Sequence, residues 1–260
     1  MHPYFIDPAV RAKIQGLLAE LEQERGFRIL YACESGSRAW GFPSPDSDYD
    51  IRIVFVYPRE KYLSITQPAD QINLPITDDA LDIAGWELRK FLHLAAKSNV
   101  TPFEWLNSNI VYHEQDGFKE KAREVIKPYF STLPAANHYL GLTQKTLMQS
   151  LQEPKVKIKK YFYALRPVLA ALWVATSQSI PPLQFERLWP DLITDSAVRE
   201  ALEKLLERKE QAVEGELISR IPVLDTFIET SRGQVQEALQ QVEKTRSELD
   251  KLNDFFRLWL

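Results

Sequence analysis

The sequence predicts an α+β protein, with a small mixed sheet flanked by helices and followed by an all-helical domain. Two observations predict this fold class. Short apolar segments rich in strand-forming residues lie in the first part of the chain. Beyond about residue 115, apolar residues recur at helical spacing almost throughout. With 260 residues, of which 45% are hydrophobic, the chain is long enough for both parts, which we place at residues 1–115 and 116–260.

The first domain is predicted to begin with a helix and then to combine strands with helices. Asp7 before Pro8 is typical of a helix start, and the apolar stripe that follows ends near Gly26. Strands are predicted where short runs combine β-branched and aromatic residues. In order, the predicted elements are a helix over residues 8 to about 26, strands over 29–33, 51–56 and 80–84, a helix with its apolar side over 88–95, and a short helix that starts with a capping box at 101–104.

The second domain is predicted to be a set of helices separated by proline, glycine and short polar stretches. The last of them has apolar residues at helical spacing but is too short and interrupted for a coiled coil, so we interpret it as an ordinary bundle helix. The predicted helices span residues 133–152, 155–176, 196–212, 217–230 and 234–258.

Composition excludes several classes of protein. The net charge of -4 and the pI near 5.7 give no general attraction to nucleic acid, so RNA binding requires a local basic surface. Cys33 is the single cysteine, so there is no internal disulfide, and its apolar strand predicts a core position. The longest apolar run, 168–174, is too short to span a membrane, and the N-terminal residues lack a signal-peptide pattern. We therefore expect a cytoplasmic protein without a membrane partner.

Two acids stand at the entrance of the second predicted strand. Asp48 and Asp50 are two residues apart, and such side chains point to the same side of a strand, with Cα atoms roughly 6.5 to 7 Å apart. Parallel carboxylates on one rigid edge supply the hard oxygen ligands that Mg²⁺ prefers. A pair of metal ions needs several carboxylates, which predicts a third acid nearby.

Asp82 is the best candidate for this third acid. It lies at the centre of the apolar segment 80–84, and a carboxylate in a sheet is costly to bury unless it is paired or metal-bound. The neighbouring Asp78 and Asp79 are interpreted as turn residues. We therefore predict that Asp48, Asp50 and Asp82 are catalytic residues and metal ligands.

A Gly-Ser pair follows the first predicted strand directly. Gly36 permits a backbone conformation that other residues avoid and lets a phosphate approach closely, and Ser37 adds a hydroxyl donor. By itself the pair marks an ordinary turn, and the Asp-x-Asp pair alone marks a solvated strand end. The order of strand, Gly-Ser, an arm of eleven residues, Asp-x-Asp, strand and a lone acid favours a nucleotide site.

Other residues near these motifs carry two interpretations each. Arg52 shares the strand face of the acids, so it either pairs with one of them or contacts a phosphate. Arg38 either contacts a phosphate or lies on the surface of the arm. Trp40 and Phe42 either stack on a base or anchor the arm by aromatic packing, and we favour packing.

A second group of candidate nucleotide-binding residues lies in the helix predicted over 155–176. Lys155, Lys159, Tyr163 and Arg166 recur at spacings of four, four and three, which places them on one helix face, with an apolar face beside it. Pro167 is expected to kink the helix just after Arg166. The alternative is an ordinary solvated face, but beside an acidic metal site the pattern favours nucleotide binding.

These residues resemble a known superfamily. Gly36-Ser37, Asp48-Tyr49-Asp50 and Asp82 are similar to the hallmark of the polymerase-β-like nucleotidyltransferases. The longer strings at 34–52, 82–90 and 159–167 resemble one branch, the RlaP type, named for its association with RNA ligases. The resemblance covers nearly the whole chain, and no residue of the core motif is missing.

The resemblance implies a metal-dependent enzyme that uses Mg²⁺ or Mn²⁺. It moves a nucleoside monophosphate from an NTP to an acceptor hydroxyl and releases pyrophosphate. Asp48 and Asp50 would hold both metals, and Asp82 would bind the catalytic one and help deprotonate the acceptor. Gly36 and Ser37 would grip the β- and γ-phosphates. The remaining nucleotide contacts would come from Lys159, Tyr163 and Arg166, with Lys155, Arg38 and Arg52 as further candidates.

The acceptor is an RNA end, a protein hydroxyl or a small molecule, and the association with RNA ligases favours RNA. Two other functions stay open. One is a non-catalytic nucleotide-binding or antitoxin-like module of the same fold. The other is a helical interaction scaffold. The scaffold gives no reason for the Gly-Ser and Asp-x-Asp arrangement. Neither the identity of the NTP nor the oligomeric state follows from the sequence.

Overall fold

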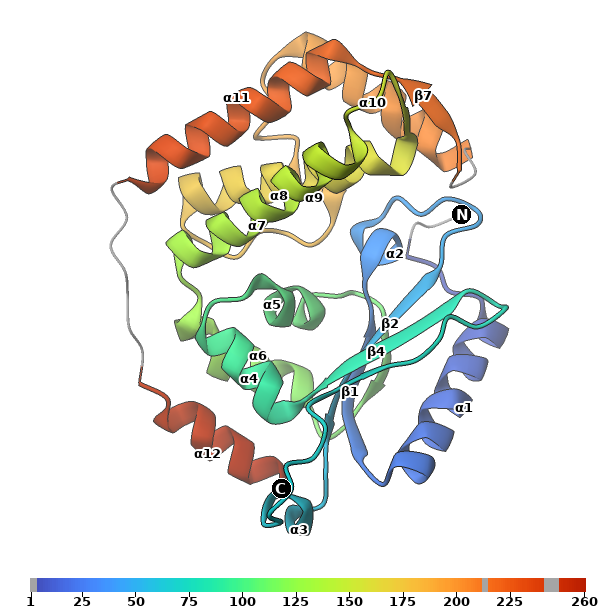
Figure 1. Cartoon of the computed structure of the whole chain (residues 1–260), viewed down its shortest axis with the longest axis vertical. Helices are drawn as coiled ribbons and strands as arrows, with labels where there is room; N and C mark the ends of the chain where they lie inside the picture. The colour runs from blue at the N-terminus through green and yellow to red at the C-terminus, as the bar shows by residue number, and fades with distance from the viewer. Residues whose placement is uncertain (1–3, 212–214, 241–247) are drawn as a thin grey trace. The chain divides into compact units, whose positions relative to one another are not determined.

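The computed structural model describes residues 4–211, 215–240 and 248–260. The fold is α+β, as predicted, and the chain divides into two compact units (Figure 1). The described residues of the first unit come from Met1–Ala39, Asp48–Tyr129 and Arg246–Leu260. Those of the second unit come from Trp40–Ser47 and Phe130–Thr245. The division into domains 1–115 and 116–260 stays a prediction.

A mixed sheet of five strands, in the order β3-β4-β2-β1-β5, forms the centre of the first unit's described residues. The β2 and β4 strands are parallel, and the other neighbouring pairs are antiparallel. Each predicted strand is present and is slightly longer than predicted. The strands are β1 (Arg28–Glu34), β2 (Tyr49–Val56), β3 (Gln71–Asn73), β4 (Leu81–Glu87) and β5 (Val111–Glu114).

Burial explains why these segments form the inner strands. Every residue of β1 after Arg28 is buried, and the last four residues of β2 are buried as well. Cys33 is one of these buried residues, as its apolar strand predicts. In β4, buried and partly exposed residues alternate, as expected of a strand with two unequal faces. The apolar segments that predicted the strands thus supply the core of the sheet.

Helices cover both faces of this sheet (Figure 1). The α1 helix lies on one face, where Ile14, Leu18 and Leu21 join the strand residues of the core. The α4, α5 and α6 helices lie on the other face. The helical elements of this unit are α1 (Pro8–Arg25), α2 (Gly36–Trp40), which ends at the unit boundary, α3 (Arg59–Tyr62), α4 (Leu88–Ala96), α5 (Val100–Leu106), α6 (Phe118–Ile126), η1 (Lys127–Tyr129) and α12 (Asp250–Trp259).

Local signals set three of the helix ends. The Asp7 carboxylate accepts the N–H of Ala9 at 2.7 Å, and Gly26 ends α1 with a φ of 63°, so both predicted ends are confirmed. The predicted cap of the short helix near residue 101 is wrong by two residues. Asn99 caps α5 and accepts the N–H of Thr101 at 3.0 Å.

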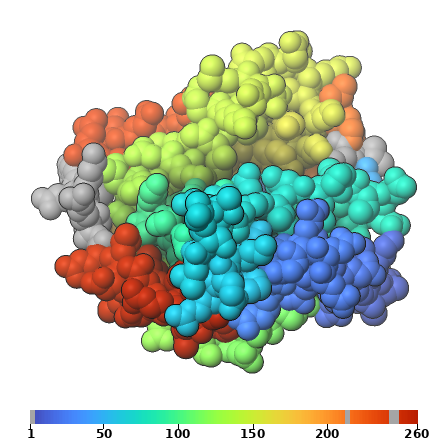
Figure 2. Space-filling model, turned by 60° about the horizontal axis from the view of Figure 1, so that its bottom comes forward, coloured from blue at the N-terminus to red at the C-terminus, as the bar shows by residue number. Residues whose placement is uncertain are grey.

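The C-terminal helix returns to the first unit. Figure 2 shows α12, in red, against the cyan segment that includes α3, where the rings of Tyr62 and Phe256 meet edge to face at 5.4 Å. On its other side, Phe255 and Trp259 pack on Phe118 of α6. This packing explains why a segment so late in the chain belongs to the unit that contains the sheet.

The second unit is mainly helical. Its long α8 helix is buried along most of its length and continues through Pro167 to Ser177, and the kink expected there stays a prediction. It packs on α7 and α11 (Figure 1). The elements of this unit are α7 (Thr132–Ser150), β6 (Lys155–Lys157), α8 (Ile158–Ser177), α9 (Phe185–Leu188), α10 (Ser196–Gln211), β7 (Leu217–Ser219) and α11 (Pro222–Leu239).

Three of the predicted helices are wrong in part. The helix predicted from residue 155 begins at Ile158, and the one predicted from 217 begins at Pro222. The intervening residues form β6 and β7, which pair with each other so that Val156 lies opposite Ile218, and both are buried. The helix predicted over 234–258 is interrupted, because α11 ends at Leu239 and α12 begins at Asp250. Residues 212 and 241–247 of these predictions lie outside the described residues.

The arm before Asp48 packs into the second unit. Phe42 stacks on Phe162 at 4.7 Å and meets Phe185 edge to face at 5.3 Å, while Trp40 lies edge-on to Tyr163 at 5.9 Å. The favoured interpretation of Trp40 and Phe42 as packing anchors is therefore confirmed.

In the described part of the chain, helices that combine the length and apolarity needed to cross a bilayer are absent.

Candidate active site

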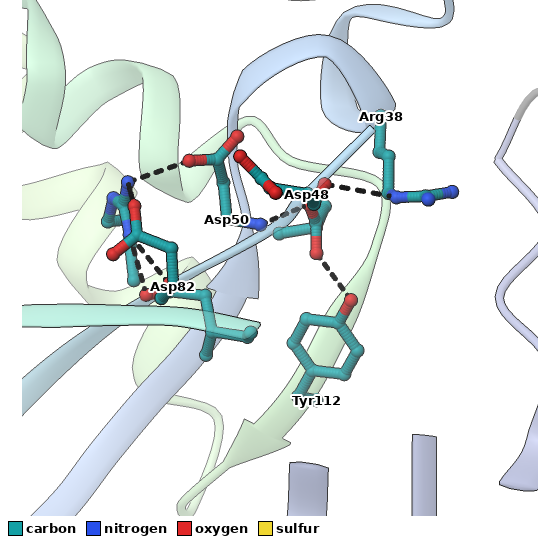
Figure 3. A network of polar contacts seen from close by, with 8 residues as sticks. Arg38, Asp48, Asp50, Asp82 and Tyr112 are labelled. Carbon is teal, nitrogen blue, oxygen red and sulfur yellow. Dashed lines mark hydrogen bonds and ion pairs between the residues drawn. The ribbon is translucent and has the colours of Figure 1, made fainter. Parts of the chain in front are cut away.

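Neighbouring strands bring two of the predicted acids together. The strands β2 and β4 run parallel, and their register places Asp50 directly beside Asp82. Asp48 lies immediately before β2, and Figure 3 shows its carboxylate close to that of Asp50. All three residues are partly exposed, so an external ligand can reach them. The arrangement gives one end of the sheet a set of three carboxylates.

Arg52 lies between two of these carboxylates. Its Nη2 donates to Oδ1 of Asp50 and to Oδ2 of Asp82, each at 2.8 Å. Its Nη1 donates to the backbone carbonyl of Asp82 at 2.9 Å. The Arg52 side chain is only 18% exposed, and its acid partners are 26% and 28% exposed. The prediction that Arg52 pairs with an acid is confirmed, with two acids rather than one.

Burial and the neighbouring acids raise the affinity of Asp50 for a proton. The pKa of Asp50 is raised to about 6, mainly by burial, with the charges of Asp82 and Asp48 adding to the shift and Arg52 opposing it. Within the described part of the chain, no three His, Cys, Asp or Glu side chains are placed closely enough to hold a metal ion. Instead, the guanidinium of Arg52 bridges Asp50 and Asp82. The chemistry of the donors, three hard carboxylates under mutual repulsion, nevertheless fits a divalent cation.

Gly36 lies against Asp50. Its φ is +59°, and a Cβ atom at this position would come within 2.0 Å of the Oδ2 atom of Asp50. Glycine is therefore required twice, by the backbone conformation and by the close carboxylate. The predicted Gly-Ser turn is wrong in form, because Gly36 and Ser37 begin the short α2 helix. Their contact with phosphate stays a prediction.

Arg38 braces the backbone next to the acids. Its Nε donates to the carbonyl oxygen of Asp48 at 3.2 Å, and its guanidinium lies 3.9 Å from the centre of the Tyr49 ring. Figure 3 shows Arg38 extending past Asp48 toward the outside of the group. Arg38 is therefore partly buried and is held by Asp48 and Tyr49, so it is not simply a surface residue of the arm. Its contact with a phosphate stays a prediction.

Glu34 contacts the acid group, although no motif in the sequence assigns it to the site. Its side chain is completely buried at the end of β1, and Oε1 accepts the backbone N–H of Asp50 at 2.8 Å. The hydroxyl of Tyr112, on β5, donates to Oε2, and Figure 3 shows Tyr112 beneath the acids. Burial raises the pKa of Glu34 to about 7 despite these two donors. The available signal was a carboxylate at the end of an apolar strand, where burial requires a partner.

The predicted basic residues belong to the second unit, and all but Lys155 lie on α8. Lys155 is exposed on β6, before the helix begins, so its place on the predicted stripe is wrong. Lys159 and Tyr163 are partly exposed on α8. Arg166 is only 3% exposed, and its guanidinium lies 4.6 Å from the centre of the Trp40 ring. The role of these residues in nucleotide binding stays a prediction.

Comparisons with known proteins show which family the chain resembles. The sequence model of the RlaP family, described as the RNA repair pathway DNA polymerase beta family, matches residues 10–258. The uncharacterized protein YcgL of Bacillus subtilis (strain 168) is 43% identical over 247 residues, which are 94% of this chain and 95% of that protein. A solved nucleotidyltransferase-like protein from Exiguobacterium sibiricum 255-15 is 10% identical, with a TM-score of 0.34, over 89% of this chain and 74% of that one.

Proposed function

Because this chain belongs to the RlaP family, the RNA repair pathway DNA polymerase beta family, we propose that it transfers a nucleoside monophosphate from an NTP to the hydroxyl of an RNA end. The family supports a nucleotidyltransferase; the metal dependence, the NTP and the RNA acceptor are our proposal. One observation carries it. Asp50 and Asp82 lie side by side on parallel strands, with Asp48 at the entrance of the same strand pair. We place the reaction in the cytoplasm, where NTPs are supplied.

The three acids would hold Mg²⁺ or Mn²⁺. Bound there, the metal supplies positive charge to the triphosphate and lowers the pKa of the acceptor hydroxyl. Asp82 accepts the proton of that hydroxyl as its oxygen attacks the α-phosphorus. The new bond to the α-phosphorus forms while its bond to the oxygen that bridges to the β-phosphate breaks, and pyrophosphate leaves with that oxygen. Asp50, which Arg52 and Gly36 contact, keeps its carboxylate directed toward Asp82.

Groups on the same unit are available for the phosphates. Ser37 is partly exposed directly after Gly36 and offers a hydroxyl donor to the β- and γ-phosphates. Arg38 and Arg52 are the cations next to the acids, at Asp48 and between Asp50 and Asp82. Guanidinium groups suit phosphate oxygens because they donate two parallel hydrogen bonds.

The test is label transfer by the full chain. The protein is incubated with Mn²⁺ or Mg²⁺, each α-labelled NTP and an RNA with a free 3′-hydroxyl. We expect label on the RNA together with pyrophosphate, and a loss of about 10³-fold for Asp50→Asn, since metal-held charge stabilises the transition state by several kcal/mol. Asp78→Asn, the same change at an exposed turn residue, is the matched control and should keep full activity.

A binding module without turnover is the second candidate, and the pairing of Arg52 with both acids favours it. In that case NTP and metal raise the melting temperature of the protein, but wild type and Asp50→Asn alike release no pyrophosphate. Label transfer by the wild type that Asp50→Asn abolishes would reject this candidate.

A further inference from the structure

A chain of polar contacts crosses four neighbouring strands beneath the acids. It begins at Tyr112 on β5, passes through Glu34 on β1 to Asp50 on β2, and reaches Asp82 on β4 through Arg52. These strands are consecutive in the sheet. The acids therefore receive support from a strand on the far side of β1, and Glu34 is the link.

The backbone at the end of β1 explains why a side chain is needed there. In an antiparallel pair, the N–H and C=O of Asp50 would both bond the backbone of Ser35. The N–H of Ser35 does donate to the carbonyl of Asp50, at 2.8 Å. The Ser35 carbonyl instead accepts the N–H of Ala39, at 3.4 Å, as α2 begins. The Oε1 atom of Glu34 takes the place of this lost acceptor for the Asp50 N–H.

Glu34 is itself fixed from several directions. The Tyr112 hydroxyl donates to its Oε2 atom, and the Ser108 hydroxyl donates to its backbone carbonyl at 2.7 Å. Its own N–H donates to the carbonyl of Ile110 at 2.9 Å. A completely buried carboxylate is costly, and it persists only where hydrogen bonds compensate for the lost water. Its position is thus determined by β5 and the segment before it.

We propose that Glu34, held by Tyr112, is a positioning residue that fixes the backbone of Asp50 and so the direction of its carboxylate toward Asp82. This inference rests on the proposed function and extends it to two residues that touch neither substrate nor metal. Because Glu34 is completely buried, it acts through Asp50. Small displacements of such a carboxylate matter, since a misplacement of about 1 Å can cost about 10²-fold in rate.

The first test needs no ligand and reads the proposed hydrogen bond directly. Amide hydrogen exchange at Asp50 is measured by NMR for wild type, Glu34→Gln and Glu34→Ala. We expect Glu34→Gln to keep the protection of the Asp50 amide, because its carbonyl oxygen still accepts the N–H. Glu34→Ala should lose at least about tenfold in protection, as removal of one acceptor predicts. Glu114→Ala, which removes a carboxylate from the exposed end of β5, is the control and should change nothing at Asp50.

The second test measures nucleotidyl transfer with the same variants. We expect Glu34→Ala to lower kcat by about 10²-fold and to leave the KM for NTP within about threefold of the wild-type value. Glu34→Gln should keep most of the wild-type kcat. Tyr112→Phe leaves Glu34 in place but removes one of its hydrogen-bond donors, so its kcat should lie between those of Glu34→Ala and Glu34→Gln. It replaces Glu34→Ala in the test if that variant does not fold. A variant that only weakened the fold would lower the amount of active protein and would not separate Gln from Ala.

The outcomes separate this inference from the proposed function. If wild type transfers no nucleotide, the proposed function fails, and the exchange experiment still decides whether Glu34 holds Asp50. If the Asp50 amide is equally protected in wild type and Glu34→Ala, the inference is wrong whatever the activity. It is also wrong if an active wild type and Glu34→Ala have the same kcat.

Discussion

The two charged regions of this protein are built in different ways. In the first unit, Asp50, Arg52 and Asp82 lie on adjacent parallel strands, and Arg52 contacts each of the two acids at 2.8 Å. In the second unit, Lys155 is exposed on β6, and Arg166 is buried eleven residues later beneath Trp40. The sheet thus concentrates charge at one place, whereas the basic segment divides its charge between the surface and the core.

The difference predicts how substitutions behave. A residue of the acid group has several charged partners, so its removal should change the others, and the effects of two substitutions should not add. A lysine of the basic segment should act singly, with an effect that depends on its own exposure.

Asp82→Asn should lower nucleotidyl transfer by about 10³-fold, because it removes a metal ligand and the proton acceptor together. The double variant Asp50→Asn/Asp82→Asn should be at most about threefold slower than Asp82→Asn alone. The reason is that the effects of substitutions are not additive when the groups act as a unit. The measurement is kcat/KM for label transfer with both single variants and the double variant. Independent losses that multiply to about 10⁶-fold would show that the two carboxylates do not act together.

The stability of the first unit should depend on pH through Glu34. Its pKa is about 7 in the folded chain, above the ordinary value of 4.5, because burial outweighs Tyr112, the Asp50 N–H and Arg38, and Asp50 adds repulsion. The folded state therefore binds the extra proton. This proton stabilises the folded state fully below about pH 4.5. As the pH rises to 7, the free energy of unfolding falls by up to about 3 kcal/mol.

Glu34→Gln removes this titration and is the matched variant. The free energy of unfolding is measured with urea at pH 5 and at pH 8. From pH 5 to pH 8, it should fall by about 2 to 3 kcal/mol more in wild type than in the variant. Asp50, whose pKa is raised to about 6, titrates in the same direction in both proteins, so most of the difference between them comes from Glu34. Parallel pH profiles for wild type and variant would contradict the assignment.

Part of the acid group follows from the sequence for a physical reason. Alternation along a strand places Asp50 and Arg52 on one side, as their hydrogen bond confirms, and the cost of an unpaired carboxylate selects Asp82 from its neighbours. What the sequence does not contain is the parallel register that places Asp82 beside Asp50. That register depends on packing of both strands between helices, which no local pattern specifies.

Residues far apart in the sequence account for what was missed. Glu34 depends on Tyr112, which lies 78 positions later on the edge strand β5. Likewise, residues 155–157 satisfy a helical spacing together with α8, yet they pair with 217–219 as strands. A three-residue strand is too short to show its own period, so the helical pattern of the longer segment obscures it.

Arg52→Met should lower the free energy of unfolding at pH 7 by about 2 kcal/mol, because Asp50 and Asp82 would then face each other without a cation. The loss should be smaller at pH 5, where Asp50, with a pKa of about 6, is mostly protonated. Urea unfolding at both pH values is the measurement. Arg257→Met removes an exposed arginine and should cost close to nothing at either pH. Equal losses for Arg52→Met at the two pH values would mean that the aliphatic packing of Arg52, rather than its charge, stabilises the sheet.

The smallest effects should come from the basic segment and should differ between two lysines only four residues apart. Lys159→Ala should raise the KM for NTP by about fivefold to tenfold if the partly buried α8 lysine contacts phosphate, in line with one charge-assisted hydrogen bond. Lys155→Ala removes the same charge from an exposed strand and should change KM by less than about twofold. Initial rates at 50 and 300 mM salt distinguish the two, because an exposed charge acts only through the screened field. Equal effects at both lysines would restore the single basic stripe that their spacing predicts and would remove the contrast between the two regions.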